Sequence, residues 1–259
     1  HAVVGPCTVE GLGQLTVVRA GGHDTACAVH ALQRDTARDA YFLSCGSWSV
    51  LGVLRDGPLL SQEARELGIS NEARADAGLR PLFNLTGLWI LQECQRQWRD
   101  EGRTHDIVEL LRLAEAAPST GIVIDTEDPR FAVPDAMVDR VREVIDEAGT
   151  GLPTLDEGAI VRVVLESLAT RYADGVAALD ALTGARVPQL NLVGGGSRNA
   201  LLCQLTADAV GMPVVAGPVE ASVLGSMLAQ LEVMGHLAPA DRNAVIGATA
   251  STVRYDPAR

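Results

Sequence analysis

The sequence predicts an α/β fold in which a mixed sheet is flanked by helices. Three stretches carry this prediction. Residues 190–235 read strand, glycine turn, helix, strand, helix; residues 41–54 read as a β-hairpin; and residues 156–183 form the longest helical pattern of the chain. Strands separated by helices are typical of sheets that contain parallel pairs, whereas a hairpin contributes an antiparallel pair.

The N-terminal segment predicts a strand and a helix. Residues 1–12 are small and glycine-rich and show no periodicity, residues 15–20 are apolar and β-branched, and Gly21 and Gly22 precede a helical stretch. The polar run 33–39 then reads as a linker. We therefore expect a domain boundary here, with residues 1–36 ending one domain and residues 37–259 forming a second.

The middle of the chain predicts strands first and helices afterwards. A third strand is expected near residues 78–83, after the hairpin. Helices are then expected at 84–101, 106–116 and 134–148, with a brief strand or extended run at 122–124. The long pattern at 156–183 follows helical spacing and would span about 40 Å.

The organising unit of the chain is residues 190–235. Leu190–Val193 is a short apolar run typical of a buried strand, and three glycines follow at once. Ser197 is the expected N-cap of a helix that ends at Gly211. Residues 213–216 predict another strand, and Gly217-Pro218 is expected to open another helix. Residues 241–249 read as weakly helical and 255–259 as frayed. Three leading strands followed by alternating strands and helices is the order of an actin-like (ribonuclease H-like) ATPase domain.

Charge and composition exclude several classes of function. The net charge is −12, which disfavours nucleic acid and anionic membranes as partners and favours a small-molecule ligand. No apolar run reaches the roughly 20 residues of a membrane span, and the start shows no signal-peptide pattern. The five cysteines are scattered, without a CxxC pair, which indicates reduced thiols in the cytoplasm and no zinc site. Because the sequence begins with His1, we expect a piece of a longer protein or a processed product.

The glycine turn favours a phosphate or nucleotide ligand, because backbone N–H groups and a helix N-terminus meet at the carboxyl edge of the sheet. A tight turn without ligand remains an equal alternative. A nicotinamide fingerprint is disfavoured, since Asn199 stands where a third glycine belongs and the next strand ends without an acid. A Walker-type loop is excluded, since all 21 basic residues are arginines and no lysine is present.

Asp24 is the best candidate for a catalytic base. It follows two glycines between a strand and a helix, and phosphoryl transfer to an alcohol needs one carboxylate to accept the hydroxyl proton. It could equally cap the helix that follows, and both roles are compatible. His23 could contact a substrate hydroxyl or fill the turn.

Other candidates have simpler structural explanations beside the functional ones. Ser47 could present its hydroxyl to a phosphate or stabilise a hairpin tip, Asn84 could cap a helix, and Gln92 could face a nucleotide or solvent. The acidic residues 125–128 read as a solvated turn rather than a cation site. Trp48 and Trp89 read as packing residues.

Several stretches together resemble the FGGY family of carbohydrate kinases. They are GGHDTACAV, YFLSCGSWSVLGV, NLTGLWILQECQRQW, DTEDPRF, NLVGGGSRNALLCQLTADA and VAGPVEASVLG, which cover nearly the whole chain. Within the family, the NLTGLWILQE, DPRF and AGPVEAS blocks point to the rhamnulokinase branch rather than to xylulose or glycerol kinases.

The resemblance implies an actin-like kinase of two domains, with sugar and ATP in the cleft between them and Mg²⁺ on the phosphates. The implied reaction is ATP-dependent phosphorylation of L-rhamnulose at O1. By motif, Asp24 would accept the proton. The residues that would hold the sugar are His23, Asp24, Thr25 and Asn84, and those that would contact ATP are Ser47, Gln92, Gly195, Gly196 and Asn199; no metal ligand is assigned.

The resemblance also implies that a first domain of the family is missing. Residues 1–36 would be its last strand and helix, and residues 37–259 the second, ATP-binding domain. We therefore expect the chain to need that first domain for a complete site, and to be inactive alone. A kinase for another ketose or polyol, or a non-catalytic actin-like nucleotide-binding module, remains an alternative, and the oligomeric state is left open.

Overall fold

The main sheet is mixed, and it places the hairpin at residues 40–54 beside the strand that precedes the glycine turn. The structure is a computed structural model that describes residues 2–34, 39–148, 155–184 and 186–258. Within these residues the sheet has seven strands in the order β5-β6-β4-β3-β7-β8-β9. Their bounds are β3 Ala40–Cys45, β4 Trp48–Leu54, β5 Ser70–Ala73, β6 Leu79–Thr86, β7 Leu190–Val193, β8 Val214–Ala216 and β9 Val253–Tyr255. β3, β7 and β8 pair in parallel and the other neighbours pair antiparallel. The predicted α/β class is confirmed.

The central strands are apolar throughout because both faces of the sheet are covered. In β3, Tyr41 and Leu43 point to one face and Phe42 to the other, and all three are fully buried. The two faces belong to two separate apolar clusters, with Tyr41 and Leu43 in one and Phe42 in the other. A strand of this kind needs a helical layer on each side.

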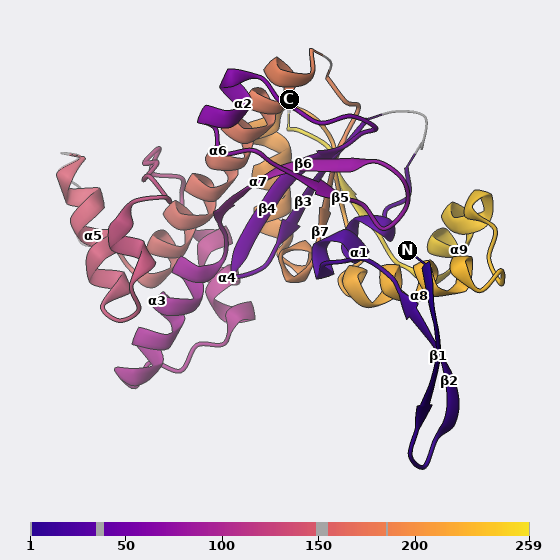
Figure 1. The fold of residues 1–259 in the computed structure, drawn as a ribbon. Helices are drawn as coiled ribbons and strands as arrows, with labels where there is room; N and C mark the ends of the chain where they lie inside the picture. The colour runs from indigo at the N-terminus through magenta and orange to yellow at the C-terminus, as the bar shows by residue number, and fades with distance from the viewer. Residues whose placement is uncertain (1, 35–38, 149–154, 185, 259) are drawn as a thin grey trace.

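The larger layer holds the helices from the middle of the chain (Figure 1). They are α3 Trp89–Asp100, α4 Ile107–Ala116, α5 Met137–Glu147, α6 Glu157–Thr183 and α7 Ala200–Val210. α6 contacts α4, α7 and β4, so it forms the centre of this layer. Asp156 caps it by accepting a hydrogen bond from the Ala159 N–H at 2.8 Å, and Gly184 ends it in the left-handed conformation.

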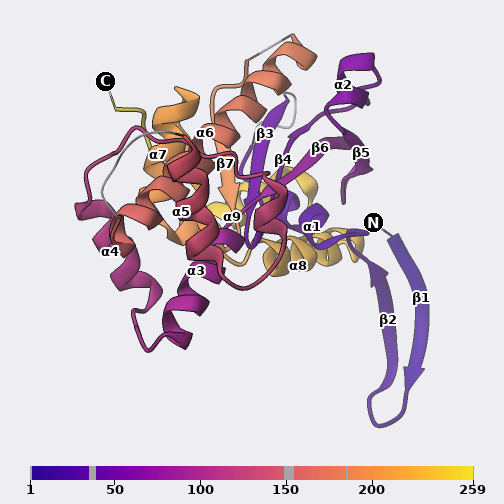
Figure 2. The same cartoon turned by 90° about the vertical axis from the view of Figure 1, so that its left-hand side faces the viewer.

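The smaller layer holds three helices of the described chain, on the other face of the sheet (Figure 2). They are α1 Asp24–His30, α8 Ala221–Val233 and α9 Arg242–Thr249. α1 and α8 touch through backbone, since a Cβ at Gly225 would lie 1.7 Å from the Cys27 carbonyl oxygen. Glycine at this position therefore sets how closely the two helices approach.

A buried cluster of polar and charged side chains links the C-terminal ends of α1 and α8. His30 Nε2 lies 3.1 Å from Glu232 Oε2, and the Arg242 Nε donates to Glu232 Oε1 at 2.7 Å. Arg242 also reaches Asp76, 3.5 Å away, which pairs with Arg34 at 3.3 Å. The side chains of His30 and Glu232 are 1% and 2% exposed, so these contacts are made away from water. Through these contacts the segment that contains His30 and Arg34 is held to α8, to α9 and to the loop that contains Asp76.

A hairpin precedes these layers. β1 Ala2–Val9 and β2 Gly13–Arg19 pair antiparallel and form a separate sheet, which projects from the body of the molecule in both views (Figure 1, Figure 2). The strand predicted at 15–20 is confirmed, whereas β1 was not predicted, since residues 1–12 show no periodicity in sequence. The predicted boundary between residues 36 and 37 lies outside the described residues.

Most of the predicted elements are confirmed, with corrected ends. The hairpin at 41–54, the strand near 78–83 and the helices at 106–116, 156–183 and 241–249 are all present. The helix expected at 134–148 begins at Met137, and residues 122–124 form no strand in the described chain. β5 and the helix α2 Gln62–Glu66 lie between the hairpin at 41–54 and β6.

The helix predicted from Asn84 was placed too early. Residues 79–86 form β6, in which Asn84 pairs with Val50 of β4, and α3 starts at Trp89 with Leu88 at the N-cap position. Asn84 therefore does not cap the helix. Pairing with β4 overrides the helical pattern, because the strand satisfies its backbone groups in the sheet.

The ends of the organising unit also differ from the prediction. Ser197 lies inside a 3₁₀ helix, Gly195–Arg198, and Asn199 is the N-cap of α7. Gly211 ends α7 as predicted, but Pro218 lies in a loop and α8 begins at Ala221. β9 was not predicted. It overlaps the segment expected to fray, residues 255–259, only at Tyr255, and it pairs antiparallel with β8 at that edge of the sheet.

Candidate active site

The glycine turn lies where two parallel strands end. Ser44 of β3 pairs with Val193 of β7, so both strands finish at the same edge of the sheet. Gly194 has a φ of 84°, and a Cβ there would lie 2.8 Å from the Cys45 carbonyl oxygen. A Cβ at Gly196 would lie 2.4 Å from Cys45 Sγ. Gly194 and Gly196 therefore let the turn pack directly on the end of β3.

Gly195 differs from its two neighbours. It is exposed, and a Cβ built on it would meet no heavy atom within 4 Å. Packing therefore does not explain the absence of a side chain at this position. A ligand that approaches the backbone would explain it.

The helix that follows the turn begins with a well-formed cap. Asn199 Oδ1 accepts a hydrogen bond from the Leu202 N–H at 3.0 Å, and Asn199 is 5% exposed. Arg198 next to it is exposed, and its nearest ion partner is Glu220 at 3.8 Å. The turn thus presents one cation and the N-terminus of an eleven-residue helix at the carboxyl edge, an arrangement that favours anions.

The tip of the β3–β4 hairpin brings Ser47 and Gln92 together. Ser47 Oγ donates a hydrogen bond to Gln92 Oε1 at 2.7 Å. The backbone holds the two segments in register, because the Leu88 N–H donates to Gly46 O at 2.8 Å and the Trp89 N–H to Ser47 O at 3.1 Å. Ser47 and Gln92 are 45 residues apart in the sequence, and their contact was not predicted.

Gly87 packs against the candidate site, although it was not among the residues predicted from the sequence. A Cβ at Gly87 would lie 2.5 Å from Gly46 O and 2.8 Å from Ser47 O, so only glycine lets this loop pack on the hairpin tip. A glycine placed between a strand and a helix was the available signal. Gly87 positions Gln92 through α3.

A buried polar cluster supports the hairpin tip from below. Ser49 Oγ lies 2.8 Å from the Tyr172 hydroxyl, and Cys45 Sγ lies 3.6 Å from the same oxygen. Burial raises the pKa of Cys45 and of Tyr172 above their ordinary values, so both groups stay protonated at neutral pH. Cys45 is thus a packing residue under the glycine turn rather than a nucleophile.

Asp24 is accessible and held at the start of α1. Its side chain is 78% exposed, and it is the first helical residue, whereas His23 is the N-cap. The His23 Nδ1 accepts a hydrogen bond from the Thr25 N–H at 3.2 Å, so the capping role considered for Asp24 belongs to His23. Asp24 Oδ1 accepts from the Thr25 N–H at 2.6 Å and from the Thr25 hydroxyl at 3.3 Å. Thr25 itself is buried, and it orients the carboxylate.

The direction of α1 places Asp24 toward the end of the molecule at which β8 finishes. Cys27 packs on Gly225 and His30 on Glu232, so α1 and α8 run in the same sense. α8 starts shortly after the end of β8, and α1 therefore also starts toward that edge. Asn84 is exposed and lies on the same face of β6 as Leu82, which belongs to the same apolar cluster as Val29 of α1. Asp24 and Asn84 thus share one face of the sheet.

A pocket of about 630 Å³ opens beside the glycine turn. Its walls include Leu111 and Arg112 of α4, Asn199 and Leu201 at the start of α7, and Tyr255 of β9. One side of this pocket is apolar, and the other side is formed by the capped start of α7. Such a lining suits a flat, partly apolar ligand group attached to phosphates.

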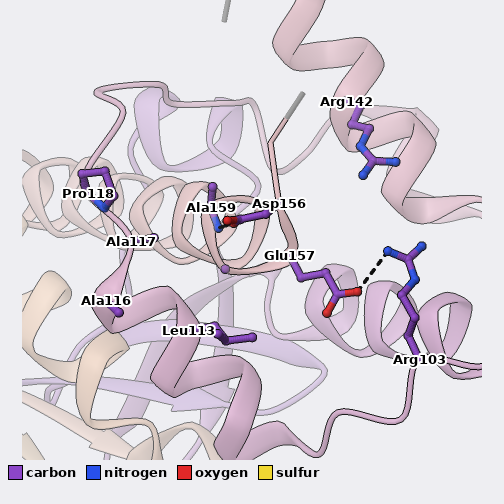
Figure 3. A pocket seen from close by; sticks show the side chains of 10 residues that line it. Arg103, Leu113, Ala116, Ala117, Pro118, Arg142, Asp156, Glu157 and Ala159 are labelled. Carbon is purple, nitrogen blue, oxygen red and sulfur yellow. Dashed lines mark hydrogen bonds and ion pairs between the residues drawn. The ribbon is translucent and has the colours of Figure 1, made fainter. Parts of the chain in front are cut away.

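A second pocket, of about 560 Å³, lies elsewhere (Figure 3). It is lined by Leu113 and the start of α6, and Arg103 bridges its rim by donating to Glu157 Oε1 at 3.0 Å. None of the sequence-predicted site residues lines it, so we do not assign it to the reaction.

The donor set decides how a Mg²⁺ ion could be held. Among the described residues, no group of three or more histidine, cysteine, aspartate or glutamate side chains is arranged to bind a metal. Mg²⁺ in nucleotide sites keeps several waters and needs only one or two carboxylates besides the phosphates. The residues present fit an ion carried by a nucleotide better than one caged by protein.

Comparison with known families identifies the family to which this chain belongs. The model of the FGGY family of carbohydrate kinases, C-terminal domain, matches residues 41–232. The chain belongs to the FGGY family of carbohydrate kinases. Among curated FGGY relatives, a rhamnulokinase from Bacteroides thetaiotaomicron is 38% identical over 227 residues, which are 88% of this chain and 46% of that protein.

Solved structures of FGGY kinases share the fold. A xylulose kinase from Rhodospirillum rubrum is 20% identical with a TM-score of 0.67, covering 99% of this chain and 51% of that one. A Plasmodium falciparum glycerol kinase with ADP is 16% identical with a TM-score of 0.60, covering 90% of this chain and 45% of that one. The actin-like fold is therefore confirmed, and the chain spans about half the length of the relatives it matches.

Two further expectations from the sequence can be compared with the structure. Among the described residues, no helix is both long and apolar enough to cross a bilayer. All five cysteines are free thiols, four of them buried. The roles assigned to individual site residues remain predictions.

Proposed function

We propose that this chain is the nucleotide-binding half of a sugar kinase that uses ATP to phosphorylate L-rhamnulose at O1, in the cytoplasm. The observation that carries the kinase assignment is the carboxyl edge, where an unhindered glycine, a capped helix start and the Ser47–Gln92 pair lie together. The choice of sugar rests on the 38% identity with a rhamnulokinase.

On the nucleotide side, the phosphates would lie against Gly195 and the start of α7, with Gly196 and Asn199 shaping the turn. Backbone N–H groups and the exposed Arg198 offset the negative charge there. The Ser47 hydroxyl can turn from Gln92 to a phosphate oxygen, since both side chains are exposed. The base would occupy the pocket beside Asn199. Mg²⁺, carried on the phosphates, would supply charge neutralisation.

On the sugar side, Asp24 would accept the proton of the attacking hydroxyl. Its carboxylate is exposed, and Thr25 fixes one of its oxygens, which leaves the other free to face the sugar. His23 and Asn84 would donate to or accept from other sugar hydroxyls. In a loose transition state, position and charge matter more than the strength of the base.

The sugar can be tested in a protein completed with a first half. The first half of the Bacteroides thetaiotaomicron rhamnulokinase is joined to His1, and ATP-dependent phosphorylation of L-rhamnulose, L-fuculose and L-xylulose is measured side by side. We expect L-rhamnulose to give the highest kcat/KM. A higher value for another ketose would change the substrate while keeping the kinase, and kinase activity toward none of them would contradict the proposal.

A non-catalytic module that binds nucleotide is the second candidate. It predicts that the completed protein binds ATP and transfers no phosphate to any sugar, and that substitution of Asp24 changes neither property.

A further inference from the structure

Trp48 does not pack in the way that the sequence analysis expected. It was read as a packing residue, and that reading is wrong, because Trp48 is 61% exposed and belongs to neither apolar cluster of the described chain. By contrast, Trp98 is 1% exposed. Trp89 packs against the larger cluster and donates its indole N–H to Phe131 O at 2.9 Å. Trp48 is thus the tryptophan whose ring is offered to a ligand.

The backbone holds this exposed ring in a defined place. Trp48 is the first residue of β4 and pairs with Thr86 of β6. Its carbonyl oxygen accepts a hydrogen bond from the Gly46 N–H at 2.9 Å. A Cβ at Gly87 would lie 2.8 Å from the Trp48 carbonyl carbon, so the loop after β6 also packs on it. The ring therefore stands on a strand end that is held from two sides.

Alternation along β4 shows which face of the sheet Trp48 takes. Ser49 points to the larger layer, where its hydroxyl lies 2.8 Å from the Tyr172 hydroxyl of α6. Trp48 therefore points to the smaller layer, on the face that holds α1. The pocket beside Asn199 is lined by residues of α4 and α7, which lie in the larger layer. The indole thus faces away from the layer in which we place the nucleotide base.

On its own face, Trp48 is a diagonal neighbour of Asn84. Trp48 pairs with Thr86, whereas Asn84, two residues earlier in β6, pairs with Val50. Diagonal neighbours on one face of an antiparallel pair lie within reach of an aromatic side chain. Asp24, at the start of α1, shares this face. The exposed ring therefore lies on the same face as two residues that we assign to the sugar.

A sugar offers two kinds of surface to a protein. Its hydroxyls bond to polar side chains such as Asn84, whereas its C–H groups are apolar and fit the face of an aromatic ring, which carries partial negative charge. We propose that the indole of Trp48 packs against the C–H groups of the sugar and holds it beside Asp24. This inference rests on the proposed function and adds a binding residue to its sugar side.

The test uses the completed protein, in which the first half of the Bacteroides thetaiotaomicron rhamnulokinase is joined to His1, and the ketose that gives the highest kcat/KM. Trp48→Leu keeps an apolar side chain without a ring, so it should raise KM for the ketose at least tenfold and change KM for ATP less than twofold. Trp48→Phe keeps an aromatic face and should leave KM for the ketose within threefold. Leu60→Ala removes another exposed apolar side chain, in the loop before α2, and should change neither KM.

Two kinetic results would overturn the proposal. Equal KM for the ketose in Trp48→Leu and Trp48→Phe, whether raised or not, would show that the face of the ring is not used. An equal rise in KM for the ketose and for ATP would indicate that Trp48 packs between the two halves of the protein instead.

If the completed protein phosphorylates no ketose, tryptophan fluorescence decides. Titration with L-rhamnulose should shift the emission of the unchanged protein and not that of Trp48→Phe. The same response in both proteins, or none in either, would overturn the proposal. A shift that depends on Trp48, without phosphate transfer, would contradict the kinase assignment and leave the sugar contact standing.

Discussion

At the scale of single residues, the proposed function depends on an exposed carboxylate. Asp24 is exposed, and His23 already provides the cap of α1. The sequence analysis left base and cap as equal alternatives, and the structure assigns the cap to the neighbouring residue. A base role for Asp24 stays a prediction, beside the local role shown by its hydrogen bond from the Thr25 N–H at 2.6 Å.

Replacing the carboxylate by an amide tests that role. In the completed protein, Asp24→Asn keeps the shape of the side chain but removes the proton acceptor, so we expect kcat to fall by roughly 10²–10⁴. Binding of ATP, measured by calorimetry, should stay within twofold. Asp174→Asn, an exposed position on α6, is the control and should leave kcat unchanged. A kcat for Asp24→Asn within threefold of the unchanged protein would remove Asp24 from the mechanism.

The two neighbouring glycines of the turn give a matched pair of variants. A Cβ at Gly196 would lie 2.4 Å from Cys45 Sγ, so Gly196→Ala should destabilise the fold by about 1–3 kcal/mol in urea unfolding. Gly195→Ala meets no atom within 4 Å and should leave stability unchanged. If phosphate lies against the backbone there, Gly195→Ala should weaken ADP binding at least tenfold. Unchanged ADP affinity in Gly195→Ala would place the nucleotide elsewhere.

At the scale of elements, the contact between α1 and α8 holds the candidate base relative to the sheet. Burial, and after it the neighbouring Arg242, lowers the pKa of His30 below its ordinary value of 6.5. Glu232 and Asp76 act in the opposite direction with smaller effect. His30 is therefore neutral in the folded protein at neutral pH.

The lowered pKa of His30 predicts that the folded protein loses stability in mild acid. The unfolded chain binds a proton to His30 at higher pH than the folded chain does, so the contribution is complete above pH 6.5 and is lost as the pH falls below it. We expect the urea midpoint to be lower at pH 5.5 than at pH 7.5, and His30→Gln to narrow that difference. His236→Gln, at an exposed position, should keep the full difference. An unchanged difference in His30→Gln would show that other groups cause it.

Elements also show where sequence patterns gave way to pairing. Residues 84–86 continue a helical pattern, but they pair with β4 and extend β6. β9 was not predicted and pairs with β8, and β1 pairs with β2 without any periodicity of its own. In each case a neighbouring strand satisfies the backbone hydrogen bonds, and such a neighbour is not visible in a local window.

At the scale of the whole molecule, the chain should bind nucleotide and turn over little. The glycine turn and its pocket lie within the described residues, whereas the relatives contain a further half. We expect ADP binding by calorimetry with the isolated chain and phosphate transfer to L-rhamnulose below about a thousandth of the rate of the completed protein. Efficient transfer by the isolated chain would show that the other half is dispensable.

The sequence by itself determined the type and order of the long elements, the family, and the candidate residues near the glycine turn and Asp24. These are local properties: apolar periodicity marks α6 and β7, and turn glycines mark the ends of strands. Only the tertiary structure decided which distant residues meet. It paired Ser47 with Gln92, packed Gly196 on Cys45, buried His30 against Glu232, and left Leu15 and Val17 of the hairpin exposed. Such contacts depend on sheet order and on close backbone approach, and neither is encoded within a few residues of chain.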